Sequence, residues 1–216
     1  NNPIPADPTS WSVYGKLYQD NLTYLRGMLE SAAAAKSRDA VDQKIGDYYA
    51  ACMDTSAIDR AGVKPIEPEL KSIAELKSVR DMGPLLARLH LETVGNGLLF
   101  GAGSAQDPDD SSREIAALDQ GGLGLPDRDY YFKEDAKSKE IRERYVAHVA
   151  KVFELLGDSG AQAKQEADTV MRMETALAQS HWTRVEERDP YKLKNKMSLP
   201  ELQKMAPALD WADYFK

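Results

Sequence analysis

The sequence predicts a mainly α-helical protein, a multi-helix lobe with one small β-hairpin. Two observations carry this prediction. Apolar residues recur at helical spacing through most of the chain, and a glycine-rich stretch near its middle breaks that spacing. The chain has 216 residues, of which 42% are hydrophobic and 29% charged. A chain of this size and composition can bury a core, as one large or two small domains.

The first part of the chain carries four expected helices. Apolar residues over 17–35 keep an i, i+3/i+4, i+7 spacing, which predicts a long helix whose apolar stripe faces a core. Asp39 is the expected N-cap of a second helix that ends near Asp54. Two more helices follow, marked by apolar residues at helical spacing: Leu70, Ile73 and Leu76, then Met82, Leu85, Leu86 and Leu89.

Between residues 95 and 120 the period changes. Residues 97–103 and 113–119 flank the turn-rich segment DPDDSS, which predicts a β-hairpin with a long polar connection. Asp107, Asp109 and Asp110 are acidic enough for a calcium loop. The glycine and the terminal glutamate of an EF-hand are absent, so a solvated turn is favoured.

Two further long helices are expected over 140–156 and 162–180. Gly157 ends the first, and Asp158 or Ser159 caps the second. Ser198 and Glu201 form the capping box of a short helix. We interpret the helical acidic residues as solvated and not as an acid pair. These residues are Asp20, Asp42, Asp47, Glu166, Asp168 and Glu174.

The most unusual segment is GGLGLPDRDYYF, residues 121–132. Its glycines and proline exclude a regular helix, so the segment is an irregular connection. The alternating leucines and the aromatic residues predict a loop held against a core, with Leu123, Leu125 and Tyr130 buried and Arg128 paired with a carboxylate or loop carbonyls. The alternative, a glycine-rich turn that cradles a phosphate, is disfavoured because no helix-opening Lys-Ser/Thr follows.

Four segments together resemble the amino-terminal half of the neprilysin family of zinc metallopeptidases. They occur in the family's order and at about its spacing, so the resemblance covers nearly the whole chain. It implies that residues 1–216 are the amino-terminal helical lobe of a neprilysin-like metallopeptidase, whose zinc-binding catalytic domain is not in this chain. The segments are NNPIPADPTSW at 1–11, YYAACMDTSAIDRAG at 48–62, the loop at 121–132 and RDPYKLKNKMSLPELQKMAPALDWADYF at 188–215.

The resemblance implies that the parent protein is an exported zinc metalloendopeptidase that cleaves peptides. The partner of this lobe is then the carboxy-terminal catalytic domain of the same protein, and the lobe helps to enclose the substrate chamber and limit substrate size. Size exclusion needs a rigid wall and no reactive group. Localisation is extracytoplasmic by the same resemblance: periplasmic, secreted or a membrane-anchored ectodomain.

Family members bind zinc through H-E-x-x-H, in which two histidines share one helix face. The only three histidines are His90, His148 and His181, and none has a second histidine at i+4. We therefore predict no catalytic residue, no metal ligand and no cofactor in this chain, which is inactive alone; zinc belongs to the parent enzyme. Each histidine is interpreted as lying in a helix or at its end.

One substrate contact is predicted, at Tyr14. In the family, an arginine precedes an aromatic-Gly pair and a second aromatic residue, and its guanidinium can bind a peptide carboxylate. Here Trp11 and Tyr14 match the aromatic residues, whereas Ser10 replaces the arginine and Ser12 the glycine. The alternative is that Tyr14 packs in the core at the start of the first helix.

Charge and cysteine content exclude several classes of partner and bond. The formal net charge is −7 and the isoelectric point about 5.1, so the basic surface that nucleic acid requires is missing. Cys52 is the single cysteine and has no internal disulfide partner. We expect a small buried apolar role for it on a helix. No apolar run reaches the ~20 residues that span a bilayer, so no membrane segment is predicted in this chain.

The alternative function is a stand-alone helical peptide- or partner-binding module without catalysis. The two readings differ in whether the source gene encodes a segment with H-E-x-x-H. A lobe separated from its catalytic half keeps exposed apolar surface. We expect this surface around Ile4, Trp11, Trp211, Tyr214 and Phe215.

Overall fold

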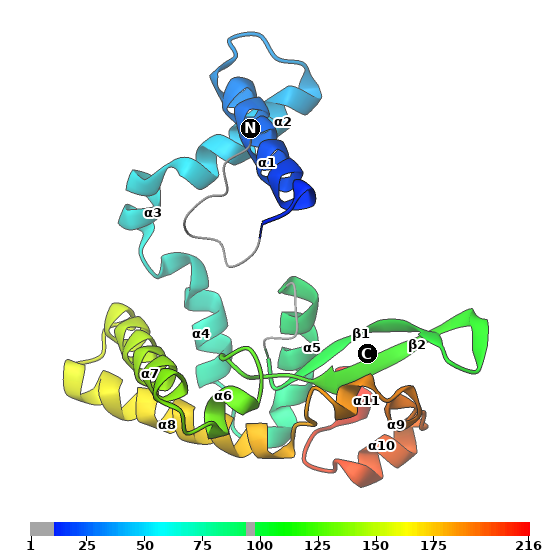
Figure 1. Ribbon diagram of the computed structural model, residues 1–216. Helices are drawn as coiled ribbons and strands as arrows, with labels where there is room; N and C mark the ends of the chain where they lie inside the picture. The colour runs from blue at the N-terminus through cyan, green and yellow to red at the C-terminus, as the bar shows by residue number, and fades with distance from the viewer. Residues whose placement is uncertain (1–10, 94–97) are drawn as a thin grey trace. The chain divides into compact units, whose positions relative to one another are not determined.

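The computed structural model describes residues 11–93 and 98–216 (Figure 1). Within them the chain forms eleven α-helices, three short 3₁₀ helices and one two-stranded antiparallel sheet. The prediction of a mainly α-helical fold with one small β-hairpin is confirmed. The chain divides into two compact units, Asn1–Pro65 and Ile66–Lys216.

The first unit contains three helices, each opened by a side-chain cap. The caps Ser12, Asp39 and Asp54 accept backbone N–H groups of the first turn, which would otherwise lack partners. The expected cap at Asp39 is confirmed. The third helix is not predicted from sequence, because seven residues are too few for a periodic signal. The helices are α1 (Val13–Ala34), α2 (Ala40–Met53) and α3 (Thr55–Ala61).

The helices α1 and α2 approach each other closely at Gly46. A Cβ at this position would lie 2.4 Å from the carbonyl oxygen of Ala32, so only glycine fits. Arg38, in the connection, donates from Nη1 to Asp47 Oδ1 at 2.9 Å. Gly46 is the only buried residue of the three helices. Leu29 of α1 and Tyr49 of α2 are only half-buried, so the pair buries no large side chain completely.

Two predictions for this unit are wrong. The sequence predicts that the apolar stripe of α1 faces a core, but no residue of α1 is buried. Cys52 is predicted to be buried, but it is exposed. Periodicity shows which side of a helix is apolar, and it does not show whether another element covers that side.

The second unit has two long helices, several short ones and the hairpin. Gly157 ends α7 in a left-handed conformation with φ of 110°, and Ser159 caps α8, as predicted. The capping box of Ser198 and Glu201 opens α10. The helices are α4 (Glu67–Ala74), α5 (Met82–Glu92), α6 (Asp129–Phe132), α7 (Ala136–Leu156), α8 (Gly160–Ser180), α9 (Pro190–Leu193), α10 (Leu199–Met205) and α11 (Trp211–Tyr214), with 3₁₀ turns at Val79–Asp81 and Glu186–Arg188. A further 3₁₀ turn, Lys64–Ile66, spans the boundary between the units in the sequence.

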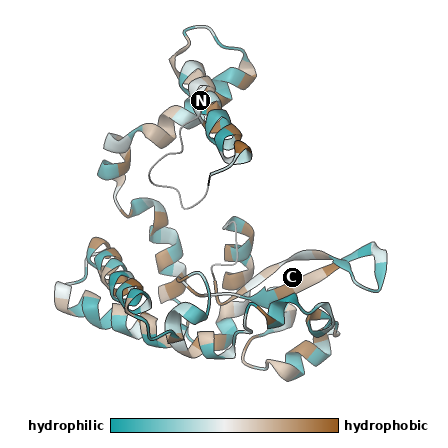
Figure 2. Cartoon of the chain, viewed as in Figure 1, coloured by the Kyte–Doolittle hydropathy of each residue, from teal (hydrophilic) through white to brown (hydrophobic). Residues whose placement is uncertain are grey.

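The hairpin pairs β1 (Phe100–Asp107) with β2 (Asp110–Gln120), and Phe100 lies opposite Gln120. The predicted hairpin is confirmed, but its predicted long polar connection is wrong. The polar residues continue the two strands, and only two residues connect them. Figure 2 shows the tip as the hydrophilic end of the hairpin. Residues at the tip, such as Gln106 and Glu114, are polar and exposed. Its sequence therefore lacks the apolar alternation that marks a half-buried strand.

The main core of this unit joins α5, the base of the hairpin and α11. Leu86, Leu209, Trp211 and Tyr214 are buried together, and Phe100 packs against them. The prediction of exposed apolar surface at Trp211 and Tyr214 is therefore wrong, because these side chains are only 6% and 7% exposed. Aromatic residues near a chain end fill a core here.

The other three positions of that prediction differ in outcome. Phe215 is 42% exposed, as expected. Trp11 is half-buried, and Ile4 lies outside the described residues.

His90 links the three elements of this core. Its Nε2 lies 2.8 Å from the carbonyl oxygen of Phe100, which only accepts, so Nε2 carries the proton. Its Nδ1 lies 2.9 Å from the Tyr214 hydroxyl. The imidazole thus bridges β1 and α11.

Asp107 ties the hairpin tip to the segment after α9. It is only 2% exposed, so the prediction that it belongs to a solvated turn is wrong. Its carboxylate accepts from the Lys196 ammonium and from the Asp109 N–H. A second pair joins Lys194 to Asp109. Residues almost 90 positions apart make these contacts, which no local pattern reveals.

We expect Asp107→Asn to lower the urea midpoint at neutral pH. The hydrogen bond from Lys196, with that from the Asp109 N–H, holds the pKa of Asp107 below its usual value of about 3.9. The stabilisation is full above that ordinary pKa and disappears as pH falls through the lower folded-state pKa. The difference from wild type should shrink accordingly in urea unfolding at decreasing pH. The exposed Glu114→Gln is the control, and a pH-independent difference at Asp107 would contradict the ion pair.

Candidate functional site

Tyr14, the predicted substrate contact, lies in the first turn of α1. Its side chain is 85% exposed, so the alternative of a packed core residue is wrong. Ser12, at the family's glycine position, has a structural role, since its Oγ accepts the Gly15 N–H at 3.0 Å. Ser10 lies outside the described residues. A free phenol ring beside the exposed Val13 is available for contact, and substrate binding by Tyr14 stays a prediction.

The histidines lie where the sequence predicts them, in helices or at their ends. His90 is in α5, His148 in α7, and His181 directly follows α8 with Nε2 3.1 Å from the Gly121 carbonyl oxygen. Across residues 11–93 and 98–216, no three His, Cys, Asp or Glu side chains gather where they could hold a metal ion.

The loop at 121–132 is held against α8 through its apolar side chains. Leu125 and Tyr131 are buried with Ala178, while Leu123 and Tyr130 are half-buried around them. The predicted burial is confirmed for Leu125 and is only partial for Leu123 and Tyr130. The backbone N–H of Leu125 donates to Tyr131 Oη at 3.0 Å, which closes the loop on itself.

Glu174 of α8 is the polar anchor of this loop. Tyr131 Oη donates to its Oε2 at 2.6 Å, and Tyr145 Oη of α7 donates to its Oε1 at 2.8 Å. Burial, and then the bond to Glu174, raise the pKa of both tyrosines, so both hydroxyls remain donors at neutral pH. A Cβ at Gly124 would lie 1.9 Å from Tyr145 Oη, which explains why the loop has glycine there.

The interpretation of Glu174 as a solvated residue is therefore wrong. The sequence could not show its hydrogen bonds, because the partners lie 29 and 43 positions away. Glu166 is half-buried. The remaining helical acids are exposed, as predicted: Asp20, Asp42, Asp47 and Asp168.

Arginines fix the backbone of the same loop. Arg128 donates from Nε to the Ala178 carbonyl at 3.4 Å, lies 3.7 Å from Asp129 Oδ1, and places its guanidinium 5.2 Å from the Phe132 ring centre. The predicted pairing of Arg128 is confirmed. Arg142 donates to the carbonyls of Tyr130 and Lys133. The sequence offered no signal for Arg142, which lies on an otherwise ordinary helix.

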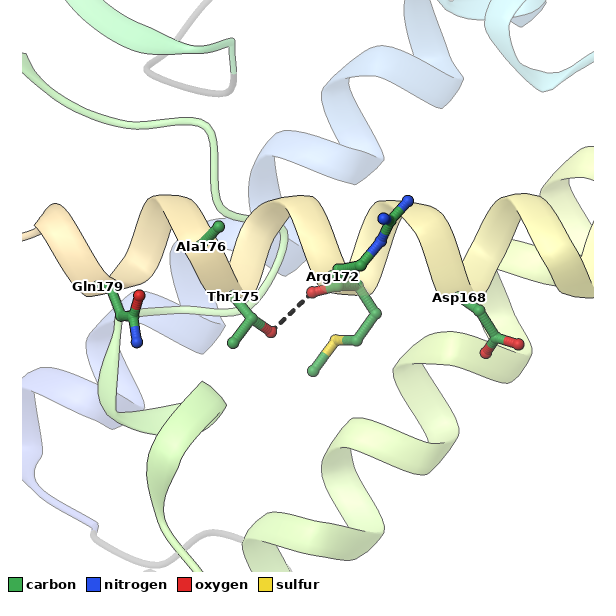
Figure 3. A pocket seen from close by; sticks show the side chains of 6 residues that line it. Asp168, Arg172, Thr175, Ala176 and Gln179 are labelled. Carbon is green, nitrogen blue, oxygen red and sulfur yellow. Dashed lines mark hydrogen bonds between the residues drawn. The ribbon is translucent and has the colours of Figure 1, made fainter.

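A shallow hollow of about 410 Å³ lies along one side of α8 (Figure 3). Thr175 uses its hydroxyl to bond the Met171 carbonyl of its own helix at 2.7 Å. Because all of the lining residues come from one helix, polar groups do not converge on the hollow as they do in ligand pockets. The lining residues are Asp168, Met171, Arg172, Thr175, Ala176 and Gln179.

Comparison with known proteins defines the class. The fold matches the zinc metalloprotease Zmp1 of Mycobacterium tuberculosis, in complex with an inhibitor, with a TM-score of 0.84 and 30% identity over 100% of this chain and 32% of that one. Neprilysin-3 of Drosophila melanogaster is 32% identical over 100% of this chain and 28% of its own length. An endothelin-converting enzyme homolog of Locusta migratoria is 31% identical over 99% and 30%.

The sequence model of the amino-terminal part of peptidase family M13 matches residues 1–216. The chain belongs to this family, which confirms the resemblance seen in its motifs. It spans less than a third of the length of the relatives above. Among the described helices, none combines the length and apolarity needed to cross a membrane.

We expect Leu125→Ala to lower the free energy of unfolding by about 2–5 kcal/mol, because it leaves a cavity between the loop and α8. Chemical denaturation followed by circular dichroism measures the change. Leu155→Ala on α7, where the side chain is 67% exposed, is the matched control and should stay within about 0.5 kcal/mol of wild type. Equal effects of the two changes would mean that the loop is a free surface element.

Proposed function

We propose that this chain is the non-catalytic amino-terminal lobe of an exported zinc metalloendopeptidase that cleaves peptides. One observation carries the proposal: all 216 residues match family M13, while the sequence has no H-E-x-x-H. The residues present do not fit a zinc site, since the three histidines are separated along the chain and the described side chains form no ligand group. The zinc belongs to a carboxy-terminal catalytic domain of the same protein.

The role we propose for the lobe is to enclose the substrate chamber and so limit substrates to peptides. A wall of this kind must be rigid. The anchoring of the loop at 121–132 by Glu174, Arg128 and Arg142 supports this role, because it fixes an irregular segment between two long helices. Extracytoplasmic localisation belongs to the same proposal and is supported by the neprilysin and endothelin-converting enzyme relatives.

The proposal predicts that residues 1–216 alone neither bind zinc tightly nor cleave peptides. The complete polypeptide of the source gene should contain one zinc per chain and cleave a quenched fluorescent peptide in a chelator-sensitive way. Metal analysis and fluorescence on both proteins make the comparison. Stoichiometric zinc in the 216-residue chain contradicts the proposal. A complete gene product without H-E-x-x-H that still binds peptides supports the stand-alone binding module instead.

Tyr14 is proposed as a contact for an apolar side chain of the peptide. In the complete enzyme, Tyr14→Ala should raise KM roughly fivefold and leave kcat nearly unchanged, because it removes an aromatic contact worth about 1 kcal/mol from both bound states. Tyr191→Ala, which removes a similarly exposed ring on α9, is the control. Identical kinetics for wild type and Tyr14→Ala would remove Tyr14 from the substrate site.

A further inference from the structure

Within the first unit, α1, α2 and α3 leave a large apolar surface uncovered. Gly46 is the only buried residue in α1, α2 and α3, so these helices bury no large side chain. Exposed apolar residues are common singly, but contiguous ones mark an interface. Most of the exposed apolar residues of α1 lie on one side of the helix, which we call the α1 face: Leu17, Tyr18, Tyr24, Leu25 and Met28.

On the opposite side of α1, charged side chains already pair with each other. Lys16 pairs with Asp20, and Arg26 donates to Glu30 at 2.8 Å, each one helical turn apart. Charged residues that pair within the helix need no partner and suit a solvated side. The α1 face, by contrast, has no Lys, Arg, Asp or Glu and carries two tyrosines, a residue type enriched in protein interfaces.

A second apolar row runs along α2. It consists of Val41, Ile45, Tyr48 and Cys52, which keep the i, i+4, i+7, i+11 spacing of one helix side. All four are exposed. We call this row the α2 stripe. It places the single cysteine of the chain among apolar residues, although burial is what such a position favours.

We propose that the α1 face and the α2 stripe are the surface through which this lobe docks onto the catalytic portion of the same polypeptide. This proposal rests on the proposed function, in which the lobe works with a catalytic domain of the same protein, and it names the surface that contacts that domain. The relatives are about three times as long as this chain, so most of their polypeptide lies outside the matched region. A portion of the same chain has a high effective concentration and binds without the cost of bimolecular association.

The charge of the chain disfavours the other occupant, a second copy. Each copy carries a net charge of −7, so two copies repel at long range. Because the α1 face carries no charge of its own, the surface that covers it must also be apolar. Docking then gives the first unit the core that its own three helices lack.

The thiol of Cys52 reports on docking without any substitution. The complete polypeptide, kept reduced with a phosphine, is alkylated in its native state and in urea, and the tryptic peptide of residues 45–60 gives the rate at Cys52 alone. We expect native alkylation to be at least about tenfold slower than in urea, because docking buries the α2 stripe. A native rate close to the unfolded rate overturns the proposal.

Paired variants of the complete polypeptide test the α1 face. Leu17→Asp introduces a charge on the face and should restore alkylation of Cys52. Gln19→Asp places the same charge on the solvated side of α1 and should leave Cys52 protected. Tyr24→Ser is a milder change on the α1 face if Leu17→Asp prevents folding. Protection that persists in every face variant, or that disappears on dilution as in self-association, overturns the proposal.

Zinc content and peptide cleavage, measured on the same samples, separate this proposal from the proposed function. An active zinc protein with an unprotected Cys52 overturns docking alone. A protected Cys52 that Leu17→Asp exposes, in a protein without zinc, supports docking while the proposed enzymatic role fails.

Discussion

The packing of α7, α8 and the loop at 121–132 depends on one carboxylate. Glu174 accepts hydrogen bonds from Tyr131 in the loop and from Tyr145 on α7, and so joins α7, α8 and the loop between the hairpin and α7. A half-buried carboxylate that accepts two hydroxyls is stable in a low-dielectric surrounding, whereas an unpaired one is costly. The close approach of Tyr145 to Gly124 follows from this geometry, so a larger residue there would have to displace the Tyr145 side chain.

The two units differ in how much of their apolar surface they bury. In the second unit, aromatic residues from α11 and β1 pack into a core, and His90 of α5 hydrogen-bonds to both of these elements. In the first unit, Gly46 brings α1 and α2 together, but their apolar sides stay in solvent. A unit that buries no large side chain gains little hydrophobic stabilisation of its own.

The chain belongs to family M13, and the difference between its two units fits the roles that we propose for it. For the proposed chamber wall, the anchored loop and the core of the second unit would supply rigidity. For the proposed docking onto a catalytic portion, the first unit supplies an apolar surface.

The sequence by itself determined the family, the helical class, the cap at Asp39 and the burial of Leu125, because these depend on local spacing and on motifs. It narrowed the cap of α8 to Asp158 or Ser159, and the structure has Ser159. Only the tertiary structure decided which apolar sides are covered. Cys52 and the apolar side of α1 are exposed, whereas Trp211 and Tyr214 are buried. The partners of Asp107 and Glu174 also lie far away in the sequence. Periodicity shows which side of one helix or strand is apolar, whereas burial also requires a second element that covers that side.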